Sequence, residues 1–160
     1  MASDGAQHPI EIRPFLLQDE PFLARIAHRL HPGQTVSPRD PVAFERFFAT
    51  MSRNQLLKEP GAEAFVATID GEPAGLIAIR PDSDYFTGHR RAYIDFLVVA
   101  PEAEGGGVGR SLMLHAEEWA KVHDCLEVCL DVSADNAGAA RFYEKCGFRI
   151  DHVRMAKALS

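Results

Sequence analysis

The sequence is poor in lysine and in long apolar runs, and each shortage excludes a class of protein. It holds 4 lysines against 13 arginines in 160 residues, and its formal net charge is −6. A net acidic chain is a poor candidate for general nucleic-acid binding, which needs a cationic surface. No apolar run approaches the ~20 residues of a membrane span. The polar start, Met1 to Gln7, lacks the parts of a signal peptide. We therefore expect a cytoplasmic protein with no nucleic-acid or membrane partner.

Cysteine is also scarce, and the three cysteines cannot all pair within the chain. Cys125 and Cys129 lie in one expected strand, where four steps separate their Cα atoms by about 13 Å. A disulfide cannot span that distance, so we interpret the cysteines as small buried hydrophobic residues. No Cys-x-x-Cys or histidine pair has the spacing of a metal site, so no metal is expected.

The remaining composition is that of an ordinary globular protein. Apolar residues make up 46% and charged residues 25% of the chain. Folding at this length removes ~70% of the accessible surface of the unfolded chain, which is enough for one core. The sequence therefore predicts a single domain over residues 1–160.

Hydrophobic spacing and turn residues predict a mixed α/β order of elements. Strands are expected at residues 10–13, 64–69, 74–79, 92–100 and 126–132, followed by two short closing strands at 148–150 and 153–159. Helices are expected at residues 19–30, 40–51, 108–119 and 136–145. Asp70-Gly71 predicts a hairpin turn, and the polar segment 81–91 predicts a loop. The strands at 92–100 and 126–132 should be parallel, because a helix connects them.

A glycine-rich turn separates the strand at 92–100 from the next helix. It reads Gly105-Gly106-Gly107-Val108-Gly109. Backbone N–H groups of such a turn can converge on an anion, and the helix N-terminus adds partial positive charge. We interpret it as a phosphate site, with a purely structural turn as the alternative. A P-loop requires Lys where Arg110 stands, and the dinucleotide fingerprint requires Gly at Arg110 or Leu112. Both nucleotide interpretations fail, which leaves the pyrophosphate of another cofactor.

Two polar residues share one face of the last predicted helix. Asn136 and Tyr143 are seven residues apart, which is almost two turns and ~10 Å along the axis. An amide and a phenol at this spacing can line a long polar ligand. The alternative is a capping asparagine and a half-buried tyrosine.

Together these two segments make the sequence similar to the GNAT family of N-acetyltransferases. The family pattern after the fourth strand is Arg or Gln, two residues, Gly, one residue, then Gly or Ala. Here it reads Glu104 to Gly109. The later pattern of Asn, Ala and Tyr-Glu-Lys-x-Gly-Phe appears as Asn136, Ala139 and Tyr143 to Phe148. The resemblance is strong over residues 91–150, whereas the first 90 residues match only the order of elements.

The resemblance implies a fold, an activity and a cosubstrate. The fold is a mixed, mostly antiparallel twisted sheet with helices on both faces and a central pair of parallel strands that splay apart. The activity is direct transfer of acetyl from acetyl-CoA to a primary amine of a small molecule or peptide. Sheet edges of this fold often pair between subunits, which leaves a homodimer open.

Site residues follow from the same resemblance. The backbone of one strand would pair with the pantetheine arm and donate an N–H to the thioester carbonyl, through Leu97, Val98 and Val99. The glycine turn would hold the pyrophosphate, through Gly105, Gly106, Gly107, Val108, Gly109 and Arg110. Asn136 would contact the pantetheine chain. Tyr143 matches the general acid that protonates the leaving thiolate.

The resemblance does not fix the base that deprotonates the amine. Asp131, near the end of the fifth strand, and Asp95, in the fourth, are the two candidates, and a structural carboxylate is the alternative for each. Family members often shape the acceptor site with two loops, and an ordinary loop residue is the alternative for each candidate there: His31, Gln34, Tyr85, Phe86, His89 and Arg90.

Glu104 departs from the family pattern, because Arg or Gln is usual there. A carboxylate beside a pyrophosphate is unfavourable unless it points into solvent. We still expect acetyl-CoA to bind, with Arg110 supplying positive charge. Together with the uncertain base, Glu104 favours one alternative function: a catalytically silent acyl-CoA-binding or regulatory module.

Overall fold

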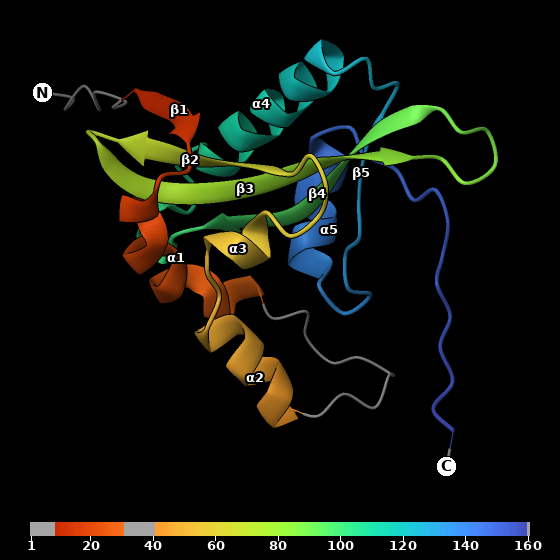
Figure 1. Cartoon of the computed structure of the whole chain (residues 1–160), viewed down its shortest axis with the longest axis horizontal. Coiled ribbons are helices and arrows are strands. Elements are labelled where there is room, and N and C mark those ends of the chain that lie inside the picture. Colours follow the sequence, from red (N-terminus) through yellow and green to blue (C-terminus); the bar gives the residue numbers. More distant parts are fainter. Residues whose placement is uncertain (1–8, 31–40, 160) are drawn as a thin grey trace, which may run out of the picture.

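The computed structural model describes residues 9–30 and 41–159 (Figure 1). Its strands are β1 (Ile10–Pro14), β2 (Glu63–Ile69), β3 (Glu72–Ser83), β4 (Arg90–Val99) and β5 (Val128–Leu130). Its α-helices are α1 (Glu20–Ile26), α2 (Pro41–Ala49), α3 (Arg53–Leu56), α4 (Val108–Val122) and α5 (Ala137–Lys145). Short 3-10 helices are η1 (Leu17–Asp19), η2 (Ala27–Leu30) and η3 (Pro101–Ala103).

The five strands form one mixed sheet in the order β1-β2-β3-β4-β5. The first four are antiparallel neighbours, and β5 lies parallel to β4 after the crossover through α4. This arrangement confirms the predicted mixed sheet. The predicted hairpin is also present, because Ile69 pairs with Glu72 around Asp70 and Gly71. Both turn residues have positive φ, 51° and 83°, as a tight two-residue hairpin turn requires.

Helices cover both faces of the sheet, and each face has its own core. Figure 1 shows α1, α2 and α3 on one side of the strands and α4 on the other. On the first side, Leu23 and Ile26 pack into a buried cluster that includes Leu76 of β3. On the second side, Leu112 of α4 packs in a cluster with Ile77. The sheet is therefore held between two apolar layers.

The helix α4 follows its predicted pattern closely. The expected apolar stripe is buried throughout, at Val108, Leu112, Ala116 and Trp119. The Trp119 indole N–H also donates to Glu63 at 2.6 Å, which pins the helix to β2. Within residues 9–30 and 41–159, no helix combines the length and apolar character needed to cross a membrane.

The loop predicted over residues 81–91 is shorter than expected. The strand β3 continues to Ser83 and β4 begins at Arg90, so only residues 84–89 form the turn. The polar sequence misled the prediction, because its charges pair across the two strands. Arg91 lies opposite Asp82 and its Nε donates to that carboxylate at 2.7 Å.

The predicted strands at 148–150 and 153–159 are wrong. Residues 148–159 have no regular secondary structure, and Met155 is 91% exposed. The alternation of apolar and polar residues there is typical of an edge strand, but a strand also needs a neighbour with a free edge of similar length. The strand predicted at 126–132 is only β5, three residues long, and so it offers a very short edge.

Candidate active site

The site begins where β4 and β5 separate. Their parallel pairing consists of three residue pairs and ends at Ile94 opposite Leu130. The strand β4 continues to Val99 and pairs there only with β3 among the residues that the structure describes. The edge of β4 that faces away from β3 is therefore unpaired over residues 95–99. Leu97, Val98 and Val99, the predicted pantetheine contacts, all lie on this free edge.

A β-bulge in β4 coincides with the separation. Phe96 pairs with Ala78 and Ile94 with Ile79, so Asp95 is an extra residue without a partner in β3. Bulges of this kind bend a strand and redirect its side chains. Ile94 accordingly lies in the α4-side core, whereas Val98 lies in the opposite core. The bulge places a carboxylate at the point where the strands part.

The glycine turn lies at the far end of the same free edge. Gly105 and Gly107 have φ of 76° and 88°, a backbone region that L side chains rarely adopt. Gly107 is the N-cap of α4, which starts at once with Val108. The first amides of a helix have no intrahelical acceptor, so the N–H groups of Val108, Gly109 and Arg110 are available to an anion.

Close packing explains the last glycine of the turn. A Cβ atom at Gly109 would lie 3.1 Å from Cζ of Phe142. The start of α4 therefore approaches α5 closely, and a larger residue would push the two helices apart. This contact links the phosphate turn to the helix that carries Tyr143.

Two ion pairs connect the turn to the other face of the sheet. Arg29 of η2 contacts Glu104, and Arg25 of α1 lies 2.8 Å from Glu102. Glu104 thus has a cationic partner from a segment 75 residues away in the sequence. The sequence reasoning missed both arginines, because no local pattern connects α1 or η2 to the turn.

Tyr143 lies in an aromatic setting on α5. Its ring makes edge contacts with Phe142 and Phe148, with centroids 5.3 Å and 5.8 Å away. Burial raises the pKa of the phenol. Asn136, at the start of the same helix, is its N-cap, and its side-chain oxygen accepts from the Ala139 amide at 3.1 Å. The capping role weighed for this residue is therefore present, and its side-chain NH₂ keeps its donor capacity.

The two candidate bases lie in one polar network. The Arg80 Nε donates to Asp95 at 3.1 Å, and the Arg80 guanidinium lies 4.4 Å from the ring centre of Tyr93. Burial raises the pKa of Asp95, while the charge and hydrogen bond of Arg80 oppose that shift. Burial and a hydrogen bond with Asp131 both raise the pKa of Tyr93. Tyr93 and Arg80 therefore bridge the two carboxylates, and the sequence offered no signal for either.

The predicted acceptor residues of the β3–β4 turn lie far from the glycine turn. They occupy the opposite end of β4, a separation of about 30 Å for a ten-residue strand. Tyr85 and Phe86 are each 89% exposed. The structure therefore separates them from the glycine turn, and their role in the acceptor site stays a prediction. His31 and Gln34, the other acceptor candidates, lie outside the described residues.

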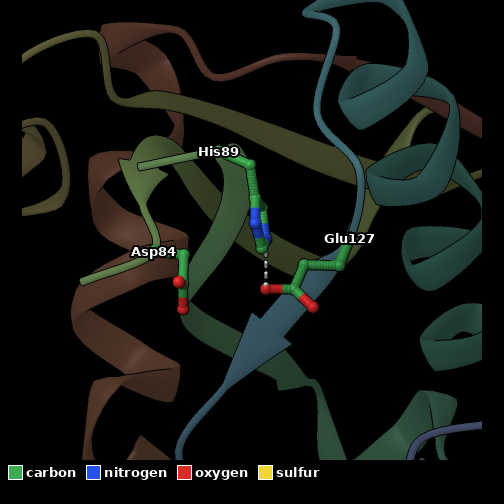
Figure 2. Close-up of side chains that lie close together, drawn as sticks. All are labelled: Asp84, His89 and Glu127. Carbon is green, nitrogen blue, oxygen red and sulfur yellow. Dashed lines mark hydrogen bonds and ion pairs between the residues drawn. The ribbon is translucent and has the colours of Figure 1, made fainter. Parts of the chain in front are cut away.

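His89 belongs instead to a polar group at the base of that turn. Figure 2 shows Asp84, His89 and Glu127. One carboxylate oxygen or imidazole nitrogen from each residue lies within 4.8 Å of those of the other two. The Asp84 Oδ1 atom already accepts hydrogen bonds from Thr87 and from the Phe86 amide. The His89 Nε2 atom lies 3.2 Å from Glu127. The contact between His89 and Glu127 joins the turn to the segment that leads into β5.

A hollow between the first helices is a further candidate surface. It has a volume of about 520 Å³ and lies between the α1–η2 segment and α2. His28 and Glu45 contribute its ionisable side chains. Neither residue was predicted from the sequence, because a single histidine or glutamate on a helix carries no spacing signal.

Comparison with known proteins identifies the family. The sequence model of the Acetyltransferase (GNAT) family matches residues 24–148. An aminoglycoside N(6')-acetyltransferase type 1 of Stenotrophomonas maltophilia is 30% identical over 59% of this chain and 67% of its own length. A mycothiol acetyltransferase of Amycolatopsis mediterranei is 30% identical over 87% of this chain and 46% of its own. The chain spans about half the length of several curated relatives it matches.

Solved structures agree with this assignment. A putative acetyl transferase from Pyrococcus furiosus superimposes with a TM-score of 0.73 and 25% identity, over 94% of this chain and all of that one. The chain belongs to the acetyltransferase (GNAT) family.

Proposed function

We propose that this chain transfers an acetyl group from acetyl-CoA directly to a primary amine of a small molecule or peptide. The observation that carries the proposal is the free edge of β4, which runs into the glycine turn at the start of α4. A cosubstrate with a diphosphate, an amide-containing arm and a thioester suits these two features in that order. Membership of the GNAT family, which uses acetyl-CoA, supports the same conclusion.

Binding would use mainly backbone groups. The amides of Val108, Gly109 and Arg110 would receive the diphosphate. The unpaired edge at Leu97, Val98 and Val99 would hydrogen-bond the pantetheine amides, much as a strand adds to a sheet edge. Asn136 would use its side-chain NH₂ to contact the same arm. This division leaves the carboxylates and the phenol for the reacting groups.

In the transfer step the amine nitrogen attacks the thioester carbonyl carbon, and the C–S bond breaks as the C–N bond forms. An N–H group on the β4 edge would donate to the carbonyl oxygen, where negative charge develops. Tyr143 would give its proton to the leaving thiolate sulfur. Burial raises the pKa of Tyr143, which keeps the phenol protonated and able to donate at neutral pH.

The amine must lose a proton before it attacks, and Asp95 or Asp131 would accept it. Asp95 sits at the bulge beside the free edge, and its raised pKa makes it a stronger base than an ordinary carboxylate. Asp131 is exposed and is tied to β4 through Tyr93. An acidic limb in the pH–rate profile that persists in both Asp95→Asn and Asp131→Asn would reject both bases.

The deciding experiment measures thiol release from acetyl-CoA with a panel of primary amines that includes an aminoglycoside and short peptides. We expect release that depends on one class of amine, with equimolar acetylated product identified by mass spectrometry. A protein that binds acetyl-CoA but releases no thiol with any amine would instead be the silent acyl-CoA-binding module. Absence of binding would reject both functions.

A further inference from the structure

The segment before the glycine turn is tied to the first helical segment by two parallel ion pairs. Arg25 and Arg29, four residues apart on consecutive helical turns, reach Glu102 and Glu104, two residues apart at the turn. The partners of the second pair are separated by 75 positions in the sequence. The contact therefore depends on the folded arrangement of α1–η2 against the turn.

The second pair has an unusual position for a surface ion pair. Glu104 immediately precedes Gly105, and the next residues form the anion-binding turn. A lone carboxylate here would repel a diphosphate. Arg29 places a guanidinium beside that carboxylate, and its side chain is 31% exposed against 56% for Glu104. Positive charge is therefore present at the entrance of the turn, supplied from another part of the chain.

Guanidinium chemistry suits a second, simultaneous contact. Arginine carries five N–H donors in a planar fork and can pair with a phosphate through two of them. A carboxylate that occupies one side of the fork leaves donors on the other side. It also restricts the rotamers of the side chain, which lowers the entropy lost when a ligand binds.

We propose that Arg29 binds the diphosphate of acetyl-CoA at the glycine turn, with Glu104 as the positioning residue that holds its guanidinium there. This inference rests on the proposed function and names a contact that the turn itself does not contain. Glu104 stands where the family pattern usually has Arg or Gln, and Arg29 would supply positive charge to the turn in place of that residue. The exposed Arg110, at the start of α4, would be a second and less fixed cation.

The test is a double-mutant cycle read by calorimetric titration with acetyl-CoA. Arg29→Ala should weaken binding by about tenfold, whereas Arg46→Ala, on the exposed face of α2, should have no effect. The decisive comparison is Arg29→Ala in a Glu104→Gln background. If Arg29 contacts the diphosphate, the loss persists there at about fivefold or more. If it merely neutralises Glu104, the loss disappears, and the inference is overturned.

Two further arms keep the result interpretable. S-acetylpantetheine lacks the diphosphate, so kcat/KM with this substrate should be the same for the wild type and Arg29→Ala. Equal losses with both substrates would contradict a diphosphate contact. Arg29→Lys keeps the charge without the planar fork, so its affinity for acetyl-CoA should lie between those of the wild type and Arg29→Ala. This variant serves as the test if Arg29→Ala proves unstable. A wild-type protein that binds no acetyl-CoA would reject the proposed function as well, whereas binding without any Arg29 effect rejects this inference alone.

Discussion

The two ends of the free β4 edge offer different chemical groups. At the turn end, the proposed ligand contacts are backbone amides set by glycine conformations and by the start of α4, together with Arg29. At the bulge end, they are ionisable side chains held by hydrogen bonds, with Asp95 on Arg80 and Tyr93 on Asp131. The first end should therefore respond to changes of backbone conformation, and the second to changes of charge and pH.

The largest expected effect comes from removing the proposed proton donor, Tyr143. Tyr143→Phe removes only a hydroxyl, and the aromatic contacts with Phe142 and Phe148 can remain. We expect kcat to fall by about 10²- to 10⁴-fold, the usual contribution of general acid catalysis. Affinity for acetyl-CoA should change little. Steady-state rates and calorimetry measure the two quantities, and an unchanged kcat would remove the acid role.

The second-largest effect is expected from a change of backbone conformation in the glycine turn. Gly107→Val forces a β-branched residue into φ of 88° and disturbs the amides at the start of α4. We expect about tenfold weaker acetyl-CoA binding and a loss of stability of about 1–2 kcal/mol, the usual cost of a left-handed L-residue. Gly88→Val is the matched control, because Gly88 has φ of 69° in the distant β3–β4 turn and open space around its Cβ position. Gly88→Val should lose similar stability and keep the wild-type affinity for acetyl-CoA. Equal losses of affinity in both variants would show that general destabilisation is the cause.

The role of the charged residues at the bulge end can be tested through the pH dependence of the reaction rate. Arg80 lowers the pKa of Asp95 against the opposing effect of burial. In Arg80→Gln that pKa rises further, so the carboxylate stays protonated to higher pH. A base must be deprotonated to act, and the acidic limb of the pH–rate profile should therefore move to higher pH. Arg91→Gln is the control, because the ion pairs of Arg91 are with Asp82 and Asp84 rather than with Asp95. A limb that stays in place in Arg80→Gln would exclude Asp95 as the base.

The smallest effect belongs to the polar group at the β3–β4 turn. His89→Gln removes the contact with Glu127, which joins two partly exposed side chains. Exposed ion pairs contribute about 0–1 kcal/mol, so the unfolding free energy should change by less than that. The acetylation rate should stay at the wild-type value. A substantial loss of rate would instead support the predicted acceptor role of this turn.

The turn end could be predicted from sequence because its signals are local. Consecutive glycines after a buried strand, and an apolar stripe beginning at Val108, define both the turn and α4 within fifteen residues or so. The hairpin at Asp70-Gly71 was equally local. Backbone geometry of this kind depends on residue type at neighbouring positions, and the structure has it where the sequence predicted.

The bulge end depends on contacts between distant segments, which the sequence does not display. Arg80 reaches Asp95 across a strand pair whose register shifts at the bulge. A single Asp in the apolar run at residues 92–100 marks a candidate carboxylate, but it predicts neither the register shift nor the partner of that carboxylate. Arg29 reaches Glu104 only after two layers of the fold assemble. The closing strands at 148–150 and 153–159 failed for a related reason, because alternation predicts a strand without showing whether a neighbouring edge exists.

Hydrogen exchange of the backbone amides tests the central claim most directly, because that claim concerns backbone groups. We expect acetyl-CoA to protect peptides that cover residues 95–110, which include the free β4 edge and the glycine turn. Peptides that cover the β3–β4 turn at residues 84–89 should exchange at the same rate with and without it. Protection confined to the β3–β4 turn, or bound acetyl-CoA with no protection at residues 95–110, would contradict the account.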